Sequence, residues 1–144
     1  MLFGRRKRRI ERLLIVEDEP LVAFDTEHFL IGEGFAIVAT VDSVAAAVRA
    51  MEGGGGIDLV LVDIDLADGN GIEVARAAQG RGIAVLFVTG NCPVDAQALA
   101  AGCLTKPYQQ RDLFVAIRAI EAVIEGGKVP RRLPDSFSLF GTAG

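Results

Sequence analysis

Five short apolar runs, each followed by a segment of helical periodicity, most constrain the fold of this 144-residue chain. The runs are rich in branched residues and lie at 13–16, 35–40, 59–63, 84–89 and 103–105. Apolar runs of this length are typical of strands covered on both faces, as in parallel sheets. The alternation therefore predicts an α/β fold, a doubly wound five-stranded parallel sheet flanked by five helices.

The segments between these runs carry helix start and stop signals. Pro20 suits the first turn of a helix, and Asp42 or Ser43 can cap the next one. Gly126 and Gly127 can end the last helix. We expect helices over residues 20–31, 44–51, 72–79, 95–101 and about 109–125.

Composition divides the chain into three parts. We expect a basic N-terminal tail over residues 1–11, one domain over residues 12–126, and a flexible C-terminal tail over residues 127–144. Residues 13–144 contain nine basic and eighteen acidic side chains, a net charge of −9 that disfavours nucleic acid as a partner. The basic run at 5–9 is interpreted as a solvated terminus.

The chain has no apolar run near the roughly 18 residues of a membrane span, and the apolar stretch after its basic start is too short for a signal peptide. We therefore expect a cytoplasmic protein. Cys92 and Cys103 lack CxxC spacing and companion histidines, so they indicate no metal site and are expected to be reduced thiols.

Polar side chains lie where the predicted strands end. Glu17 and Asp18 follow the first strand, and Asp63 ends the third. Thr89 ends the fourth, and Lys106 follows the fifth. Parallel strands bring such ends together at one edge of the sheet, where ligands bind. Converging carboxylates need a cation such as Mg²⁺, and a hydroxyl and an ammonium suit a phosphoryl group, so the set predicts phosphoryl transfer to a carboxylate.

Four motifs together resemble the receiver domain of two-component response regulators over about residues 12–126. They are EDE at 17–19, VDIDLADGNG at 62–71, VTG at 88–90 and KPY at 106–108. The resemblance implies a flavodoxin-like fold, with Asp63 as the phosphoacceptor for a histidine kinase or a phosphotransfer protein. It also implies an Mg²⁺ site made by Glu17, Asp18, Asp63 and the backbone carbonyl of Asp65.

The same resemblance implies how the phosphoryl group is held and lost. Thr89 and Lys106 match the hydroxyl and the cation that bind phosphoryl oxygens. Asp65 and Asn91 match the positions whose side chains flank the path of the hydrolytic water. We expect no enzymatic activity beyond the protein's own phosphorylation and dephosphorylation.

Two positions depart from the family pattern, and one motif points to a particular branch of the family. Cys103 stands where family members usually have an aromatic switch residue, and Ala67 replaces a frequent proline. FVTG at 87–90 together with KPY resembles the F-x-T-G and K-P-Y signature of stand-alone alphaproteobacterial receivers. We therefore expect a single-domain response regulator without a DNA-binding domain, which signals to a protein partner or acts as a phosphate sink. Its oligomeric state is left open.

Two other functions are alternatives. VDIDLAD is similar to the DxD motif of haloacid dehalogenase-like phosphohydrolases. That class also needs an acidic pair after the lysine, and only scattered acids follow Lys106 in this chain. A receiver-like interaction module that acts without phosphorylation would have lost Asp63, Thr89 or Lys106, and all three are present. His28 and Asp68 are interpreted as an ordinary boundary residue and a turn residue.

Overall fold

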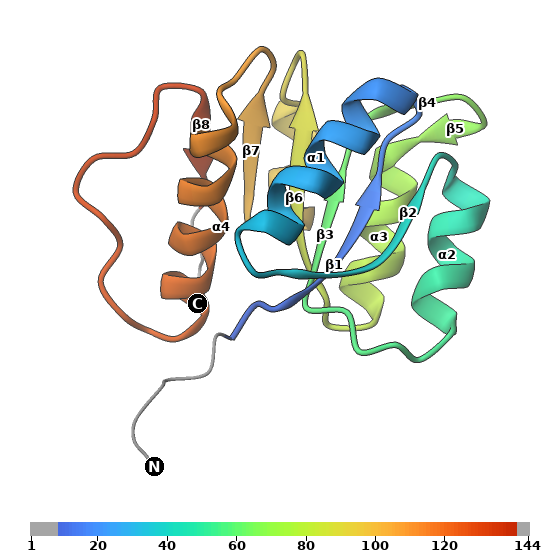
Figure 1. The fold of residues 1–144 in the computed structure, drawn as a ribbon, viewed down its shortest axis with the longest axis horizontal. Helices are drawn as coiled ribbons and strands as arrows, with labels where there is room; N and C mark the ends of the chain where they lie inside the picture. Colours follow the sequence, from blue (N-terminus) through green and yellow to red (C-terminus); the bar gives the residue numbers. More distant parts are fainter. Residues whose placement is uncertain (1–8, 141–144) are drawn as a thin grey trace.

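The computed structural model describes residues 9–140, which form a central sheet of strand order β2–β1–β3–β6–β7–β8 (Figure 1). Five of its strands run parallel: β1 (Arg12–Val16), β2 (Ala36–Val41), β3 (Leu59–Val62), β6 (Ala84–Thr89) and β7 (Gly102–Thr105). The predicted doubly wound parallel sheet is therefore confirmed. A sixth strand, β8 (Phe137–Leu139), pairs antiparallel with β7 and was not predicted.

Helices cover both faces of the sheet (Figure 1). They are α1 (Pro20–Gly32), α2 (Val44–Glu52), α3 (Gly71–Gly80) and α4 (Gln110–Ile124). The core on one face is shared with α1 and α4, and the core on the other face with α2 and α3. Successive residues of β1 alternate between them, with Leu13 and Ile15 in the first core and Leu14 and Val16 in the second. Because both strand faces are buried, the strands are continuous apolar runs in the sequence.

The helix starts agree with their sequence signals. Pro20 opens α1, and the Ser43 hydroxyl caps α2. Asn70 and Glu73 form a reciprocal capping box at the start of α3. Within the described residues, no helix is long and apolar enough to cross a membrane.

The fourth predicted helix is only a short 3₁₀ helix, η1 (Val94–Leu99). It follows Pro93, and Ala96 is its buried residue. Helices in proteins are stabilised mainly by packing an apolar face, and one small side chain offers little such packing. The segment between β6 and β7 is therefore less regular than its alanine-rich sequence predicted.

The domain begins earlier than residue 12. Residues 1–8, which include most of the predicted basic tail, lie outside the described residues. Ile10, however, is 1% exposed and belongs to the core. The buried Glu121 carboxylate accepts the backbone amides of Arg9 and Ile10 at 2.8 and 2.9 Å. The predicted tail boundary at residue 11 is therefore wrong, because these contacts hold residues 9 and 10 against the domain.

The predicted flexible tail is wrong for residues 128–140, which we call the C-terminal strap. The strap passes α4 and returns to the sheet as β8 (Figure 1). Phe137 is 6% exposed, and the Ser136 hydroxyl donates to Asp112 of α4 at 3.1 Å. A strand of three residues is too short for its alternation to be distinguished from a loop in the sequence.

Gly102 of β7 provides the space in which the strap packs. A Cβ at this position would lie 2.7 Å from the Phe137 ring and 2.8 Å from the Ser138 carbonyl oxygen. We expect Gly102→Ala to displace the strap and to lower the free energy of unfolding by about 1–3 kcal/mol. Faster amide hydrogen exchange in residues 137–140 would report the displacement. Gly32→Ala, whose Cβ meets open space, is the control, and unchanged exchange in Gly102→Ala would contradict this role.

Candidate functional site

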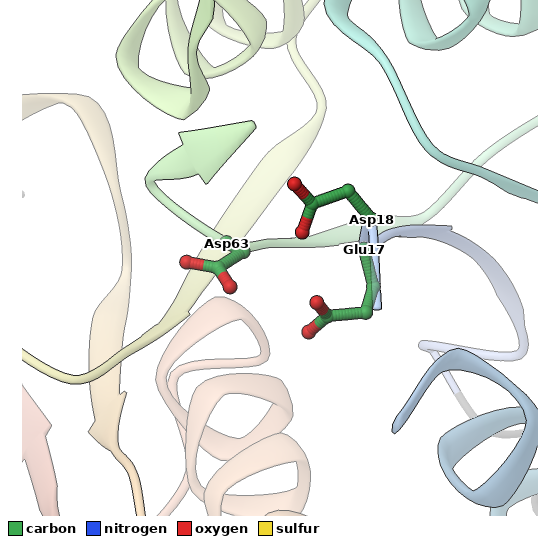
Figure 2. A group of neighbouring side chains, drawn as sticks. All are labelled: Glu17, Asp18 and Asp63. Atoms are coloured by element: carbon green, nitrogen blue, oxygen red, sulfur yellow. The ribbon is translucent and has the colours of Figure 1, made fainter. Parts of the chain in front are cut away.

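Three carboxylates meet at the carboxyl edge of the sheet (Figure 2). Glu17 and Asp18 directly follow β1, and Asp63 directly follows the neighbouring strand β3. One carboxylate oxygen of each residue lies within 4.8 Å of the others. Glu17 is buried, whereas Asp18 and Asp63 are partly buried. The structure thus brings together the carboxylates that the strand ends predicted.

Lys106, which follows β7, supplies a positive charge to this cluster. Its Nζ donates to Asp63 Oδ2 at 2.9 Å and to Glu17 Oε1 at 3.0 Å. Burial acts to lower the pKa of Lys106, but the hydrogen bonds and charges of Asp63 and Glu17 outweigh it and hold the pKa well above its usual value. The ammonium therefore stays protonated against the Asp63 carboxylate.

The three carboxylates carry more charge than Lys106 can balance. Burial raises the pKa of Glu17, although hydrogen bonds from Lys106 and from the Glu19 amide act in the opposite direction. Repulsion from Asp63 adds to the rise. A set of carboxylate oxygens with excess negative charge suits a hard divalent cation, so Glu17, Asp18 and Asp63 can hold a metal ion.

The raised pKa of Glu17 makes stability depend on pH. Its contribution to folding is complete below the ordinary pKa of 4.5 and is lost as the pH rises through the higher folded-state pKa. We expect Glu17→Gln, which keeps an oxygen acceptor for Lys106, to stabilise the metal-free protein at neutral pH and to have much less effect in acid. Thermal denaturation in EDTA at both pH values measures the difference.

The exposed substitution Glu33→Gln is the matched control, because it removes the same charge outside the cluster. A neutral-pH melting temperature below that of the wild type for Glu17→Gln would show that its charge stabilises the metal-free fold.

The backbone after Asp63 packs tightly against the start of α3. The Gly71 amide donates to the Ile64 carbonyl at 2.7 Å. Between them, β4 (Asp65–Leu66) and β5 (Gly69–Asn70) form a small hairpin. A Cβ on Gly71 would lie in hard contact with the Asp63 carbonyl oxygen and 2.9 Å from its carbonyl carbon. Gly71, which the sequence did not single out, therefore fixes the position of Asp63.

Thr89 and Lys106 are joined through the backbone, since the Lys106 amide donates to the Thr89 carbonyl at 2.8 Å. Thr89 is 2% exposed at the end of β6, next to Thr105 in the register with β7. Asn91, on the loop after β6, and Asp65, the first residue of β4, are both exposed in segments that leave the same edge of the sheet. All predicted site residues therefore lie at or beside the carboxyl edge.

Asp68 has a contact that its interpretation as a turn residue missed. Its carboxylate accepts the amides of Val44 and Ala45, at 2.8 and 3.3 Å, in the first turn of α2. The hydrogen bond from Val44 is the main cause that lowers the pKa of Asp68. Asp68 thus ties the segment after Asp63 to α2. His28 is exposed and stacks on Phe24 along α1, as expected for an ordinary boundary residue.

The expectation that the cysteines are reduced is wrong in this structure. Cys92 and Cys103 form a disulfide with their Cα atoms 6.2 Å apart. The register of β6 and β7 places Cys103 beside Phe87, within reach of the loop that carries Cys92. An 11-residue separation alone gave no signal for this contact.

The chain is similar in sequence to the receiver domain of response regulators. The family model of the response regulator receiver domain matches residues 13–118. The TorCAD operon transcriptional regulatory protein TorR of Escherichia coli K12 is 30% identical over 112 residues, which cover 74% of this chain and 48% of TorR. The DNA-binding response regulator MtrA of Mycolicibacterium smegmatis is 31% identical over 117 residues, which cover 76% and 50%. The chain spans about half the length of these curated relatives.

Solved structures show the same fold. A CheY-like receiver domain protein from Methanospirillum hungatei JF-1 has a TM-score of 0.67 and 26% identity, covering 81% of this chain and 98% of that one. The N-terminal domain of a response regulator/sensory box/GGDEF protein from Carboxydothermus hydrogenoformans has a TM-score of 0.73 and 26% identity, with the same coverage.

Proposed function

Because the chain belongs to the response regulator receiver family, we propose that Asp63 accepts a phosphoryl group from the phosphohistidine of a histidine kinase or phosphotransfer protein. The observation that carries this proposal is the position of the Asp63 carboxylate, clustered with Glu17 and Asp18 on one side and bonded to Lys106 on the other. A nucleophilic oxygen, a metal-binding cluster and a cation thus converge on one point, as phosphoryl transfer requires.

The transfer exchanges one bond at phosphorus for another. An Asp63 oxygen attacks phosphorus while the phosphorus–nitrogen bond to histidine breaks, and the nitrogen keeps the electron pair of that bond. Lys106, which now donates to Asp63 Oδ2, is placed to donate to a phosphoryl oxygen instead. The Thr89 hydroxyl is the second proposed donor. Mg²⁺, when bound, supplies positive charge to the phosphoryl oxygens.

The hydrogen bonds of the cluster indicate which carboxylate oxygens can bind a metal ion directly. Both Glu17 oxygens already accept hydrogen bonds, from Lys106 and from the Glu19 amide. Asp63 Oδ1 accepts only a long bond of 3.2 Å from the Asp65 amide among the bonds described for it. We propose that Asp18 and Asp63 bind Mg²⁺ directly, with the Asp65 carbonyl as a further ligand, and that Glu17 acts chiefly through its charge.

The phosphohydrolase alternative is not supported by the later acids. Asp112 accepts the Gln109 amide and the Ser136 hydroxyl at the start of α4, so it is committed to capping that helix and anchoring the strap. In the described part of the chain, the cluster that can hold a metal consists of Glu17, Asp18 and Asp63. Two of these acids precede the nucleophile, which is the order of a receiver.

Incubation with Mg²⁺ and acetyl phosphate tests the proposal. We expect a base-labile mass increase of one phosphoryl group and no turnover of p-nitrophenyl phosphate. Turnover would favour the phosphohydrolase, and a chain that neither reacts nor turns over would favour the phosphorylation-independent module. Phosphotransfer profiling against the histidine kinases of the source organism would then identify the donor.

We propose that another protein binds the phosphorylated domain, or that the domain acts as a phosphate sink by accepting phosphoryl groups from a shared kinase. The net charge of −9 over residues 13–144 supports a protein partner over direct contact with DNA. TorR is named a transcriptional regulatory protein and MtrA a DNA-binding response regulator, and this chain matches about half of each, so we do not carry DNA binding over to it. The single-domain, cytoplasmic role expected from the F-x-T-G and K-P-Y signature stays a prediction.

Asp65 is predicted to influence the lifetime of the phosphorylated state. Its side chain is exposed two residues after Asp63, where a carboxylate can orient the attacking water. We expect Asp65→Ala to lengthen the phosphoryl half-life severalfold, an effect smaller than the roughly 10²–10⁴-fold typical of full general base catalysis, because an exposed carboxylate only orients the water. A radiolabel chase measures the decay, with Asp95→Ala on η1 as an exposed control. Unchanged or faster decay in Asp65→Ala would remove this role.

A further inference from the structure

Two cysteines connect the segments that carry Thr89 and Lys106. Cys92 lies three residues after Thr89, and Cys103 lies three residues before Lys106. The disulfide between them therefore ties the loop after β6 to strand β7. Both ends of this link are close in sequence to the side chains proposed to bind the phosphoryl group.

The two sulfur atoms differ in their access to solvent. Cys103 is 0% exposed and lies in the core on the α2 and α3 face, next to Phe87. Cys92 is partly exposed, and its Sγ lies 3.4 Å from Thr105 Oγ1. In the reduced protein an oxidant would reach Cys92 first, and the buried Cys103 would be in position to complete the disulfide.

The loop that contains Cys92 has few other restraints. Gly90 to Pro93 form no helix or strand, and η1, which follows, buries only Ala96. Segments with few buried contacts open at a low cost in free energy. A covalent link to β7 removes much of that freedom, so the redox state of the pair controls how far the loop after Thr89 can move.

We propose that Cys92 and Cys103 form a thiol–disulfide switch that changes how well the site binds a phosphoryl group. This proposal rests on the proposed function of Asp63. The disulfide holds the loop, and with it Thr89, in the conformation described here. Reduction frees the loop, so that the Thr89 hydroxyl can approach a phosphoryl group on Asp63. The oxidised protein therefore binds a phosphoryl group less favourably than the reduced protein.

Hydrogen peroxide is a suitable oxidant for forming this disulfide. The Cys92 thiol ionises, and its thiolate attacks one peroxide oxygen as the O–O bond breaks, which gives a sulfenic acid and hydroxide. The hydroxide takes up the proton that the thiol lost and leaves as the first water. The Cys103 thiol then attacks the Cys92 sulfur, the S–S bond forms, and a second water leaves. Two thiols lose two electrons in total, and one peroxide gains them. A dithiol reverses the reaction by exchange and is itself oxidised to a disulfide.

Beryllofluoride with Mg²⁺, a mimic of a phosphoryl group on aspartate, tests the switch. It would be titrated into the protein after peroxide and after dithiothreitol, with free thiols counted by maleimide labelling and binding followed by backbone amide resonances. We expect the oxidised protein to bind about tenfold more weakly than the reduced protein. Cys92→Ser should bind with the affinity of the reduced protein after either treatment.

Equal affinity in the two redox forms, with both thiols lost on oxidation, would overturn the switch. Failure of peroxide to remove the thiols, or a redox difference that persists in Cys92→Ser, would also overturn it. Absence of beryllofluoride binding in both forms would instead contradict the phosphoacceptor function, and the switch would fall with it.

Discussion

Asp63→Asn is expected to abolish phosphorylation by acetyl phosphate. The amide oxygen is a poor nucleophile toward phosphorus, and the loss of one negative charge weakens the metal cluster. The same loss relieves repulsion with Glu17 but weakens the ion pair with Lys106, so the metal-free variant should unfold near the wild-type temperature. Intact mass measurement and thermal denaturation test the two effects on one preparation.

Asp95→Asn is the matched control for this experiment, since it neutralises an exposed carboxylate on η1, outside the cluster. It should keep the phosphoryl adduct. A full adduct in Asp63→Asn would place the acceptor at another residue, and an unfolded Asp63→Asn protein would show that its carboxylate is needed for the fold rather than for chemistry.

Gly71→Ala is expected to slow phosphorylation by about 100-fold, the size of effect that a misplacement of about 1 Å can have on a reacting group. The added Cβ meets backbone atoms of Asp63 and Ile64, which cannot turn aside as a flexible side chain can. The chain must therefore shift either Asp63 or the start of α3. The initial rate of adduct formation at saturating Mg²⁺ measures this shift at the site.

Gly80→Ala, at the other end of the same helix, is the control because its Cβ would meet open space. It should phosphorylate at the wild-type rate. A Gly71→Ala protein as active as Gly80→Ala would show that the segment after Asp63 adapts without cost.

The strands and the site were predictable because each depends on a local pattern. Branched apolar runs become central strands whenever helices cover both faces, and strand ends of a parallel sheet meet at one edge. These two rules predict from the sequence alone that Glu17, Asp18, Asp63 and Lys106 lie at the same edge of the sheet. Their distances and the double pairing of Lys106 depend on packing, which the sequence does not contain.

The missed features all depend on contacts between distant parts of the chain. Phe137 packs on β7 only because Gly102 has no side chain, and nothing in the sequence around either residue indicates that the two are in contact. Cys92 and Cys103 meet through the register of β6 and β7, and Asp68 contacts α2 from the turn of the β4–β5 hairpin. The three residues of β8 are also too few for a periodic pattern.

The most direct measurement is the location of the phosphoryl group after treatment with acetyl phosphate and Mg²⁺. Borohydride reduces an aspartyl phosphate to homoserine, and tandem mass spectrometry then reports the modified position. We predict homoserine at residue 63 in the wild type and at no position in Asp63→Asn. Homoserine at Asp18 or Asp65, or a phosphoryl group on His28, would contradict the assignment of Asp63 as the phosphoacceptor.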